Sequence, residues 1–195
     1  CEFLNFPVVS GNVSFYNETN SKSIFPTPVI GGIGVIDSLK RTIDLKTKKP
    51  GNLILILGKT IGHLDQSTFL QENYSINDGP PPEINLFNEK NNGLAVLKLI
   101  KNNLILSAHD VSSGGIIVAL AEMSMASGLG VKIFKPKKFK NSFEYFFGED
   151  QGRYLVEISK NNLKKVEMLL KESNIFFEVV ADVQKDTFEI ENVFN

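Results

Sequence analysis

The sequence predicts an α+β protein, a layered mixed α/β fold, preceded by a smaller N-terminal part. Short apolar runs alternate with segments of helical period from residue 50 onward, as in layered α/β domains. The 195 residues are 42% hydrophobic and 22% charged, which suits a soluble chain with a sizeable core. The longest uncharged apolar run is far shorter than the ~20 residues of a membrane-spanning helix, so nothing is expected to span a bilayer.

The first part of the chain contains two β-rich runs, residues 7–16 and 24–36. The polar stretch between them, residues 17–23, has a composition that suits a turn, and we expect the two runs to be adjacent strands. Further short strands are expected at residues 41–45 and 53–57. The turn signals in this part of the chain indicate a domain boundary near residues 36–50.

Residues 58–82 are rich in glycine and proline and are expected to form loops, because the run Gly79-Pro80-Pro81-Pro82 fits neither a helix nor a central strand. A helix is predicted within residues 83–101, followed by a short buried strand at 104–107. The apolar residues at helical spacing in that helix are Leu94, Leu97 and Ile100.

The next helix is expected to start after a capping Ser112 or Ser113 and to end at Gly128, a residue suited to the position after a helix. Apolar residues lie almost all round it, which indicates deep burial. The last helix starts at Asn161, between strands predicted at 154–158 and 175–181. One face of it carries Leu163, Val166, Leu169 and Leu170.

Charge and cysteine content exclude several classes. Twenty-one basic residues balance 22 acidic ones, so nothing in the net charge of −1 indicates binding to nucleic acid or an anionic membrane. The single cysteine cannot form an internal disulfide, which fits a reducing compartment, and zinc or iron–sulfur sites need more thiols. The sequence begins with Cys1, and a cleaved lipoprotein would also begin with a cysteine. We favour a piece of a longer polypeptide, because residues 3–14 are typical of core structure.

The string Gly11-Asn12-Val13-Ser14 combines groups that suit a nucleotide. Glycine lets a phosphate approach the backbone, and asparagine offers a carbonyl oxygen to Mg²⁺. The hydroxyl of Ser14 would share a strand face with Asn12. The spacing alone equally fits an ordinary turn.

The pair His109-Asp110, followed by the glycine-rich residues 111–115, resembles a catalytic pair beside an anion-binding helix start. Asp110 or Ser112 could equally cap the helix, and we favour capping and packing. His63 has no second histidine at metal-ligand spacing and is expected to have a loop or surface role.

The segment Gly148–Arg153 places two carboxylates, an amide and one of only two arginines before a strand. It could grip a polar ligand. The residues alone favour a solvated loop in which Arg153 pairs with its acidic neighbours. The sequence has no Walker A, Gly-x-Gly-x-x-Gly or His-Glu-x-x-His motif, which removes P-loop, Rossmann and zincin assignments.

Several strings together resemble, in the same order, the second half of the phosphoribosylformylglycinamidine synthase family. They are residues 7–19, 26–31, 62–67, 80–82, 108–115, 119–123 and 152–156. The family has two tandem copies of an aminoimidazole-ribonucleotide-synthetase-like unit, each with an N-terminal nucleotide-handling domain and a C-terminal domain. The resemblance implies that residues 1–45 are the tail of the second N-terminal domain and residues 46–195 the second C-terminal domain.

The resemblance also implies an activity for the full-length protein, that of a cytoplasmic ATP-dependent carbon–nitrogen ligase of purine biosynthesis. It converts formylglycinamide ribonucleotide, ATP and glutamine-derived ammonia to formylglycinamidine ribonucleotide, ADP and phosphate, with ATP and Mg²⁺ as cofactors. The implied partners are the rest of the synthetase chain and either a glutaminase subunit with a small accessory subunit or a fused glutaminase domain. The piece alone is expected to be inactive.

Carried over from the family, Gly11 is expected to contact ATP, Asn12 to bind Mg²⁺ and Ser14 to contact the ribonucleotide. Glu149, Gln151 and Arg153 correspond to a substrate-binding stretch of the first repeat and are second-rank ligand candidates. Asp65, Asp150 and Gly152 depart from the family pattern. The family's catalytic histidine lies outside this sequence, so His63 and His109 receive no catalytic role. The alternatives are another ATP-dependent member of the superfamily, or a non-catalytic interface module.

Overall fold

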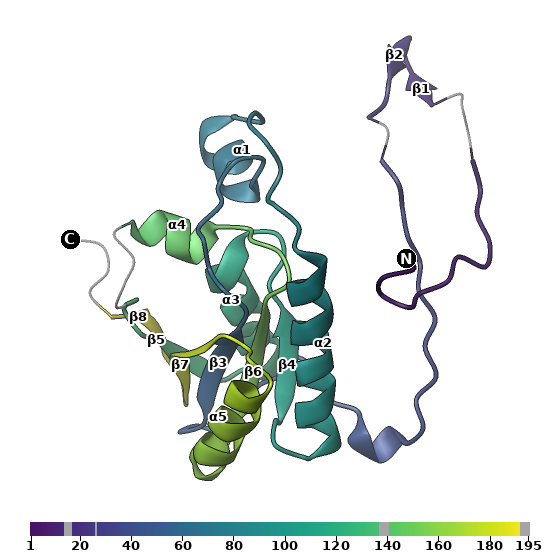
Figure 1. The fold of residues 1–195 in the computed structure, drawn as a ribbon. Coiled ribbons are helices and arrows are strands. Elements are labelled where there is room, and N and C mark those ends of the chain that lie inside the picture. The colour runs from purple at the N-terminus through teal and green to yellow at the C-terminus, as the bar shows by residue number, and fades with distance from the viewer. Residues whose placement is uncertain (14–16, 26, 137–140, 192–195) are drawn as a thin grey trace. The chain divides into compact units, whose positions relative to one another are not determined.

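The computed structural model describes residues 1–13, 17–25, 27–136 and 141–191. It divides into two compact units, Cys1–Lys40 and Arg41–Asn195, each of which is described by itself (Figure 1). The division after Lys40 lies within residues 36–50, the range in which the sequence predicts a domain boundary. None of the helices in the described ranges is long and apolar enough to cross a membrane.

The first unit contains a small hairpin in place of the two long strands expected. Strands β1 (Glu18–Thr19) and β2 (Lys22–Ser23) pair antiparallel in the polar segment, around Asn20 and Ser21, which both have positive φ. The apolar runs have no strand at residues 7–13 or 27–36. Apolar side chains there are exposed, Val9 at 92% and Ile33 at 97%. A β-strand needs a neighbouring strand to pair with, and the described part of this unit supplies none for the two apolar runs.

The second unit is built on a six-stranded sheet in the order β4-β6-β3-β7-β5-β8. All neighbouring strands are antiparallel except β5 and β8, which are parallel. The strands are β3 (Leu53–Leu57), β4 (Ser107–Asp110), β5 (Gly130–Ile133), β6 (Tyr154–Ile158), β7 (Phe177–Gln184) and β8 (Phe188–Ile190).

Helices cover both faces of this sheet, so the unit has three layers (Figure 1). α3 and α4 pack on one face, and α2 and α5 pack on the other. The α+β class expected from the sequence is confirmed. The helices are α1 (Thr68–Tyr74), α2 (Leu86–Lys101), α3 (Gly115–Ser127), α4 (Ser142–Phe147) and α5 (Leu163–Glu172), with short 3-10 turns η1 (Leu39–Arg41) and η2 (Lys160–Asn162).

Strand β3 shows how the sequence produces this layering. Side chains alternate along a strand, so Ile54 and Ile56 point into the core beneath α3 and α4, while Leu55 and Leu57 point toward α2 and α5. All four are at most 1% exposed. A strand buried on both faces reads as a continuous apolar run, which is why β3 and β6 were predictable with their observed bounds.

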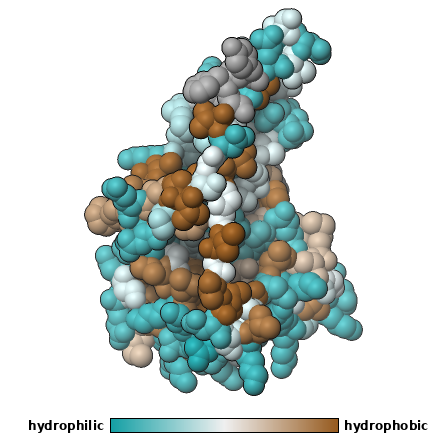
Figure 2. All heavy atoms as spheres, turned by 90° about the vertical axis from the view of Figure 1, so that its right-hand side faces the viewer, coloured by the Kyte–Doolittle hydropathy of each residue, from teal (hydrophilic) through white to brown (hydrophobic). Residues whose placement is uncertain are grey.

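Helix α2 forms where expected, but it packs by a different face. Of the three residues named from sequence, Leu94 and Leu97 are 53% and 51% exposed, and Ile100 is partly buried against the core. The buried residues are Asn92, Ala95, Val96 and Leu99. Both sets have helical spacing, so the period alone does not choose between them. Figure 2 shows exposed apolar side chains on one face of the molecule.

Some of the other predicted helices and strands are confirmed, and others are wrong or displaced. α3 ends at Gly128 with a left-handed φ of 73°, and α5 buries Val166, Leu169 and Leu170, both as predicted. The strand expected at 41–45 is wrong: Arg41 ends η1, and residues 42–45 form no strand, although the Asp44 carbonyl accepts from the Ala108 amide of β4 at 3.1 Å. The strands expected at 104–107 and 175–181 lie at Ser107–Asp110 and Phe177–Gln184. The sequence did not predict α1, α4, β5 or β8.

The chain crosses over itself at the start of β5. β7 and β8 follow one another closely, yet β5 lies between them in the sheet. Their connection passes beside Gly130, whose amide donates to the Lys185 carbonyl at 3.4 Å. A β-carbon at this position would overlap backbone atoms of Thr187. Glycine is therefore required where the connection passes.

A buried carboxylate fastens the chain where it enters the sheet. Glu157 on β6 is fully buried and accepts hydrogen bonds from the backbone amides of Lys48 and Lys49. It also accepts from Asn52 Nδ2 at 2.7 Å and Ser107 Oγ at 3.0 Å. The segment before β3 is thereby held to β6.

Candidate functional site

The candidate site in the second unit lies around the loop Gly148–Arg153, which joins α4 to β6. This loop lines a cavity of about 340 Å³ together with α2 and the connection from β4 to α3. The cavity is lined by Glu89, Asp110, Val111, Ser112, Ser113, Glu149, Gln151, Gly152, Arg153 and Tyr154. Three of the candidates expected from sequence, Glu149, Gln151 and Arg153, therefore lie together.

Asp150 turns inward and organises the loop after β3. Its carboxylate accepts hydrogen bonds from three consecutive backbone amides, Ile61 at 2.8 Å, Gly62 at 2.9 Å and His63 at 3.0 Å. The residue is 5% exposed. Hydrogen bonds to a buried carboxylate are stronger than neutral ones, so this contact fixes the path of residues 61–63.

Arg153 is 1% exposed, and its guanidinium donates hydrogen bonds to groups of the protein itself. Nε donates to the Asp150 carbonyl at 3.1 Å, Nη1 to Thr60 Oγ1 at 3.1 Å and Nη2 to the Gly148 carbonyl at 2.6 Å. Burial lowers its pKa, while the neighbouring Asp150 carboxylate opposes that shift. The expected pairing with an acidic neighbour is confirmed at 3.5 Å, but the expectation of a solvated loop is wrong at both residues.

Glu149 joins two helices. Its Oε1 accepts from Thr68 N, in the first turn of α1, at 2.8 Å and from Gly114 N, at the start of α3, at 2.7 Å. The expectation that Ser112, Ser113 or Asp110 caps α3 is therefore wrong. The capping residue is Gly114, which has no side chain, and the acceptor comes from a distant segment. Local sequence patterns cannot reveal such a cap.

The rest of the loop is less enclosed. Gln151 is exposed, and its side-chain amide reaches only the Glu149 carbonyl, at 3.5 Å. The Gly152 carbonyl accepts from Asn92 Nδ2 of α2 at 2.8 Å. Of the three second-rank candidates, Gln151 is thus the one whose polar groups are most open to a ligand.

Both histidines have polar partners within the chain. His63 Nε2 lies 3.0 Å from the Pro80 carbonyl within the loop region. His109 lies between two carboxylates, with Nε2 2.8 Å from Glu122 Oε2 and Nδ1 3.3 Å from Asp110 Oδ1. Beside them, burial raises the pKa of Tyr154, and the carboxylates of Glu89 and Asp110 raise it further.

The nucleotide candidates lie in the first unit. Gly11 and Asn12 are exposed, and no atom lies within 4 Å of the place that a β-carbon on Gly11 would occupy. Ser14 lies outside the described residues. Within the described ranges, no group of three or more His, Cys, Asp or Glu side chains could hold a metal ion. Acidic side chains of the described chain thus provide no ready-made magnesium centre.

Comparison with known proteins identifies the fold family. Residues 49–191 match the family model "AIR synthase related protein, C-terminal domain". The chain is 50% identical over 190 residues to phosphoribosylformylglycinamidine synthase subunit PurL of Pelagibacter ubique, covering 97% of this chain and 26% of that protein. The PurL subunit of Bartonella bacilliformis is 39% identical over 195 residues, all of this chain and 26% of that one.

A solved structure agrees with the fold. PurL of T. maritima complexed with FGAR has a TM-score of 0.63 at 22% identity, over 75% of this chain and 26% of that chain. The present chain spans about a quarter of the length of the curated relatives it matches. The family match to residues 49–191, which contain all six strands of the sheet, shows that the chain belongs to the AIR synthase related protein family through its C-terminal domain.

Proposed function

We propose that this chain is the C-terminal part of a phosphoribosylformylglycinamidine synthase, a cytoplasmic ATP-dependent carbon–nitrogen ligase of purine biosynthesis. The observation that carries the proposal is 50% identity to a PurL subunit along 97% of the chain. The reaction joins glutamine-derived ammonia to formylglycinamide ribonucleotide at the expense of ATP. Residues 1–45 would belong to the second nucleotide-handling domain and residues 46–195 to the second C-terminal domain.

Within that enzyme, Gly11 would contact ATP, Asn12 would bind Mg²⁺ and Ser14 would contact the ribonucleotide. The open surroundings of Gly11 support the first role, because a phosphate can approach a backbone that carries no side chain. Asn12 is exposed and offers a carbonyl oxygen, a hard ligand of the kind Mg²⁺ takes. Bound Mg²⁺ supplies charge neutralisation for the transferring phosphate.

The partners in this proposal are the rest of the synthetase chain and a glutaminase, either a separate subunit with a small accessory subunit or a fused domain. An architectural role is the second candidate function. The exposed apolar runs of the first unit favour it, with Val9, Val29 and Ile33 each more than nine-tenths exposed. Such surface suits an interface with other parts of a larger protein.

A chimeric enzyme separates the two functions. This chain would replace the matching 190 residues of the Pelagibacter ubique PurL subunit. Product formation would then be measured with formylglycinamide ribonucleotide, ATP, Mg²⁺ and ammonia. We expect activity in the chimera and a loss of about 10–100-fold on Asn12→Ala, the scale typical of a weakened metal site. Asn91→Ala, at an exposed position of α2, is the matched control and should leave the rate unchanged.

The outcomes are distinct. A folded chimera without activity would reject the enzymatic assignment and leave the architectural one. An active chimera whose Mg²⁺ dependence is the same with and without Asn12→Ala would keep the enzyme but reject the role of Asn12. The isolated 195-residue chain is expected to be inactive, so turnover by it alone would also contradict the proposal.

A further inference from the structure

Helix α2 lies at one side of the second unit (Figure 1), and it is apolar on two opposite faces. The inner face packs against the sheet through residues such as Val96 and Leu99. Three large apolar side chains are more than half exposed, those of Phe87, Leu94 and Leu97. At 3.6 residues per turn, these three lie on the side of the helix away from the sheet. A surface helix normally has one apolar stripe, so the outer stripe of α2 needs an explanation.

Helix α5 provides the comparison within the same molecule. It packs against the same face of the sheet as α2 and buries Val166, Leu169 and Leu170. Most of its exposed positions carry lysine or glutamate, and Met168 is its one exposed large apolar side chain. A helix with one packing partner therefore needs one apolar stripe in this fold. The second stripe of α2 indicates a second packing partner.

The outer stripe continues past the start of the helix. Ile84 and Leu86 lie on either side of the capping residue of α2, and both are exposed. Single exposed apolar residues are common on protein surfaces, whereas a run of them on one face marks an interaction site. The set that we call the α2 patch comprises Ile84, Leu86, Phe87, Leu94 and Leu97.

The charges beside the patch indicate the chemistry of the surface that would cover it. Lys90, Leu94, Leu97 and Lys101 fall in one row along the outer face, because they follow one another by three or four residues. Both charged residues of this row are lysines, and they lie outside the two leucines. A complementary surface would be apolar opposite the leucines, with carboxylates toward the two ends.

The length of the relatives indicates where that surface comes from. The matched residues are 26% of the Pelagibacter ubique PurL subunit, so about three quarters of that polypeptide lies outside the match. A segment of the same polypeptide is tethered, which gives it a high effective concentration at the patch. A second copy of this chain would have to bind through five side chains, whereas a stable interface between separate chains has about 20–30 residues on each side.

We infer that the α2 patch is an internal packing surface of a longer polypeptide, covered by an apolar part of that polypeptide outside these 195 residues. The inference rests on the proposed function in one respect, since it takes the chain to be part of a PurL-like protein. It assigns an interface to α2 and no step of the reaction.

The test compares the accessibility of the patch in the 195-residue chain and in the chimera described above. Leu94→Cys is introduced into both, together with Cys1→Ser, and the rate of reaction with a maleimide is measured for the α2 peptide by mass spectrometry. We expect the new thiol to react at least about tenfold more slowly in the chimera, because a covered thiol reacts when the interface opens. Met168→Cys is the matched control, since Met168 is 59% exposed and Leu94 53%, and it should react equally fast in both proteins.

A second measurement serves if the Leu94→Cys chimera does not fold. Leu97→Asp places a charge in the patch and should speed digestion of the chimera by thermolysin at least about tenfold, because the interface is lost. The same substitution should leave the digestion rate of the 195-residue chain unchanged. Met168→Asp, the same change on α5, should leave both rates unchanged.

Three labelling results would overturn the inference. Equal rates for Leu94→Cys in the two proteins would show that the patch stays open. Slow labelling already in the 195-residue chain would show that this chain or a second copy covers the patch, and sedimentation velocity would tell these two apart. Equal slowing at Met168→Cys would show that protection is not specific to the patch. In the second measurement, equal digestion of the chimera with and without Leu97→Asp would overturn it too.

The activity of the chimera is a separate readout. An inactive chimera in which Leu94→Cys is protected would keep this inference and reject the proposed reaction. An active chimera in which Leu94→Cys reacts as fast as in the 195-residue chain would do the reverse.

Discussion

Single side chains with many partners hold the second unit together, and the carboxylates of Glu157, Asp150 and Glu149 are the main examples. Each accepts backbone amides from segments far away in sequence. These amides take the place of the water molecules that an exposed carboxylate would bind. None of the three carboxylates depends on a lysine or arginine partner alone. These residues link segments that the hydrophobic core does not fix.

Loss of the Glu157 carboxylate should destabilise the chain strongly. Glu157→Ala leaves buried donors on Asn52 and Ser107 without their acceptor, and we expect the free energy of unfolding to fall by about 3 kcal/mol. Glu157→Gln keeps an acceptor and should cost about half as much. Urea denaturation measures both. Glu172→Gln, at an exposed site, should change stability by less than about 0.5 kcal/mol. Equal stability of all variants would contradict the anchoring role.

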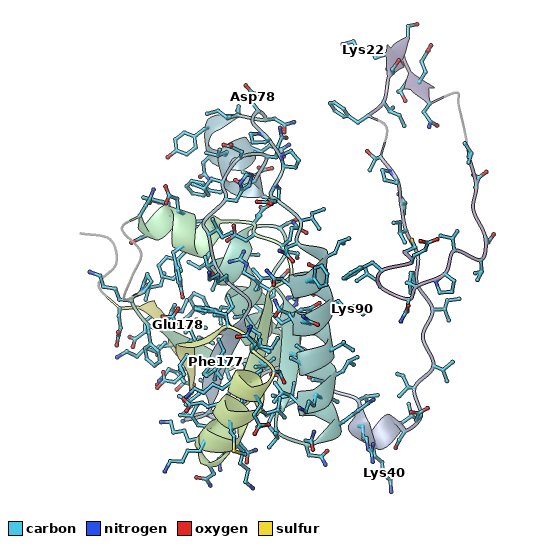
Figure 3. The ribbon with its side chains drawn as sticks, viewed as in Figure 1. Lys22, Lys40, Asp78, Lys90, Phe177 and Glu178 are labelled. Carbon is cyan, nitrogen blue, oxygen red and sulfur yellow. The ribbon has the colours of Figure 1, made fainter. Side chains whose placement is uncertain are left out.

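A buried tyrosine should make the chain sensitive to alkali. Burial raises the pKa of Tyr145 well above its ordinary value of 10.0, and the charge of Glu178, labelled on β7 in Figure 3, raises it further. Because the unfolded chain ionises first, stability is complete below pH 10 and is lost as pH rises above it. The loss should approach about 1.4 kcal/mol per pH unit for this group.

Tyr145→Phe should flatten the alkaline fall in the free energy of unfolding, measured by urea denaturation between about pH 9 and about pH 11. Tyr74→Phe is the matched control, because Tyr74 is 61% exposed and should leave the slope as it is. The slope is the quantity to compare, since either substitution can shift stability at neutral pH. An unchanged slope in Tyr145→Phe would show that Tyr145 ionises as readily in the folded chain as in the unfolded one.

At the scale of elements, the sequence predicted those whose burial leaves a plain pattern. β3 and β6 are apolar throughout, and α5 has one clear apolar face, so all three were placed correctly. α1 and α4 are 7 and 6 residues long, too short to show a period. β5 and β8 gain their pairing from distant strands. The contact face of α2 could not be chosen, because two sets of residues share helical spacing.

The observed face of α2 can be tested by a pair of substitutions on the same helix. Leu99 is fully buried, so Leu99→Ala should lower the free energy of unfolding by about 2–5 kcal/mol. Leu97 is 51% exposed, and Leu97→Ala should cost less than about 1 kcal/mol. Thermal or urea unfolding compares the two directly. A larger loss at Leu97 than at Leu99 would show that α2 packs by the face expected from sequence.

For the whole molecule, the candidate site was only partly predictable. The residues of the loop Gly148–Arg153 were identified, but their partners come from three other parts of the chain, at Thr60 and Ile61, at Thr68 and at Gly114. A sequence motif shows which polar side chains are present, but it does not show which of them already have hydrogen-bond partners in the folded chain. Glu149 and Arg153 were second-rank ligand candidates, and the structure shows that both have hydrogen-bond partners within the folded chain.

The second unit should fold without the first. Both apolar cores are formed by residues from Ile43 onward. A chain that begins at Arg41 should therefore unfold cooperatively, with a free energy of unfolding within about 1 kcal/mol of that of all 195 residues. Urea denaturation followed by circular dichroism makes the comparison. Loss of cooperativity on removing residues 1–40 would show that the first unit completes the core.

The crossing at Gly130 restricts the order in which the sheet can assemble. β7 ends beside the start of β5, and β8 begins at that same end on the other side of β5. The two strands therefore enclose β5. If these two strands met first as a hairpin, β5 could reach its place only after they had separated again. Productive assembly therefore lays β7 against β5 before the chain turns back along the other side. Since β5 leaves the ribosome before either partner, synthesis from the N-terminus presents the strands in the order that avoids this kinetic trap.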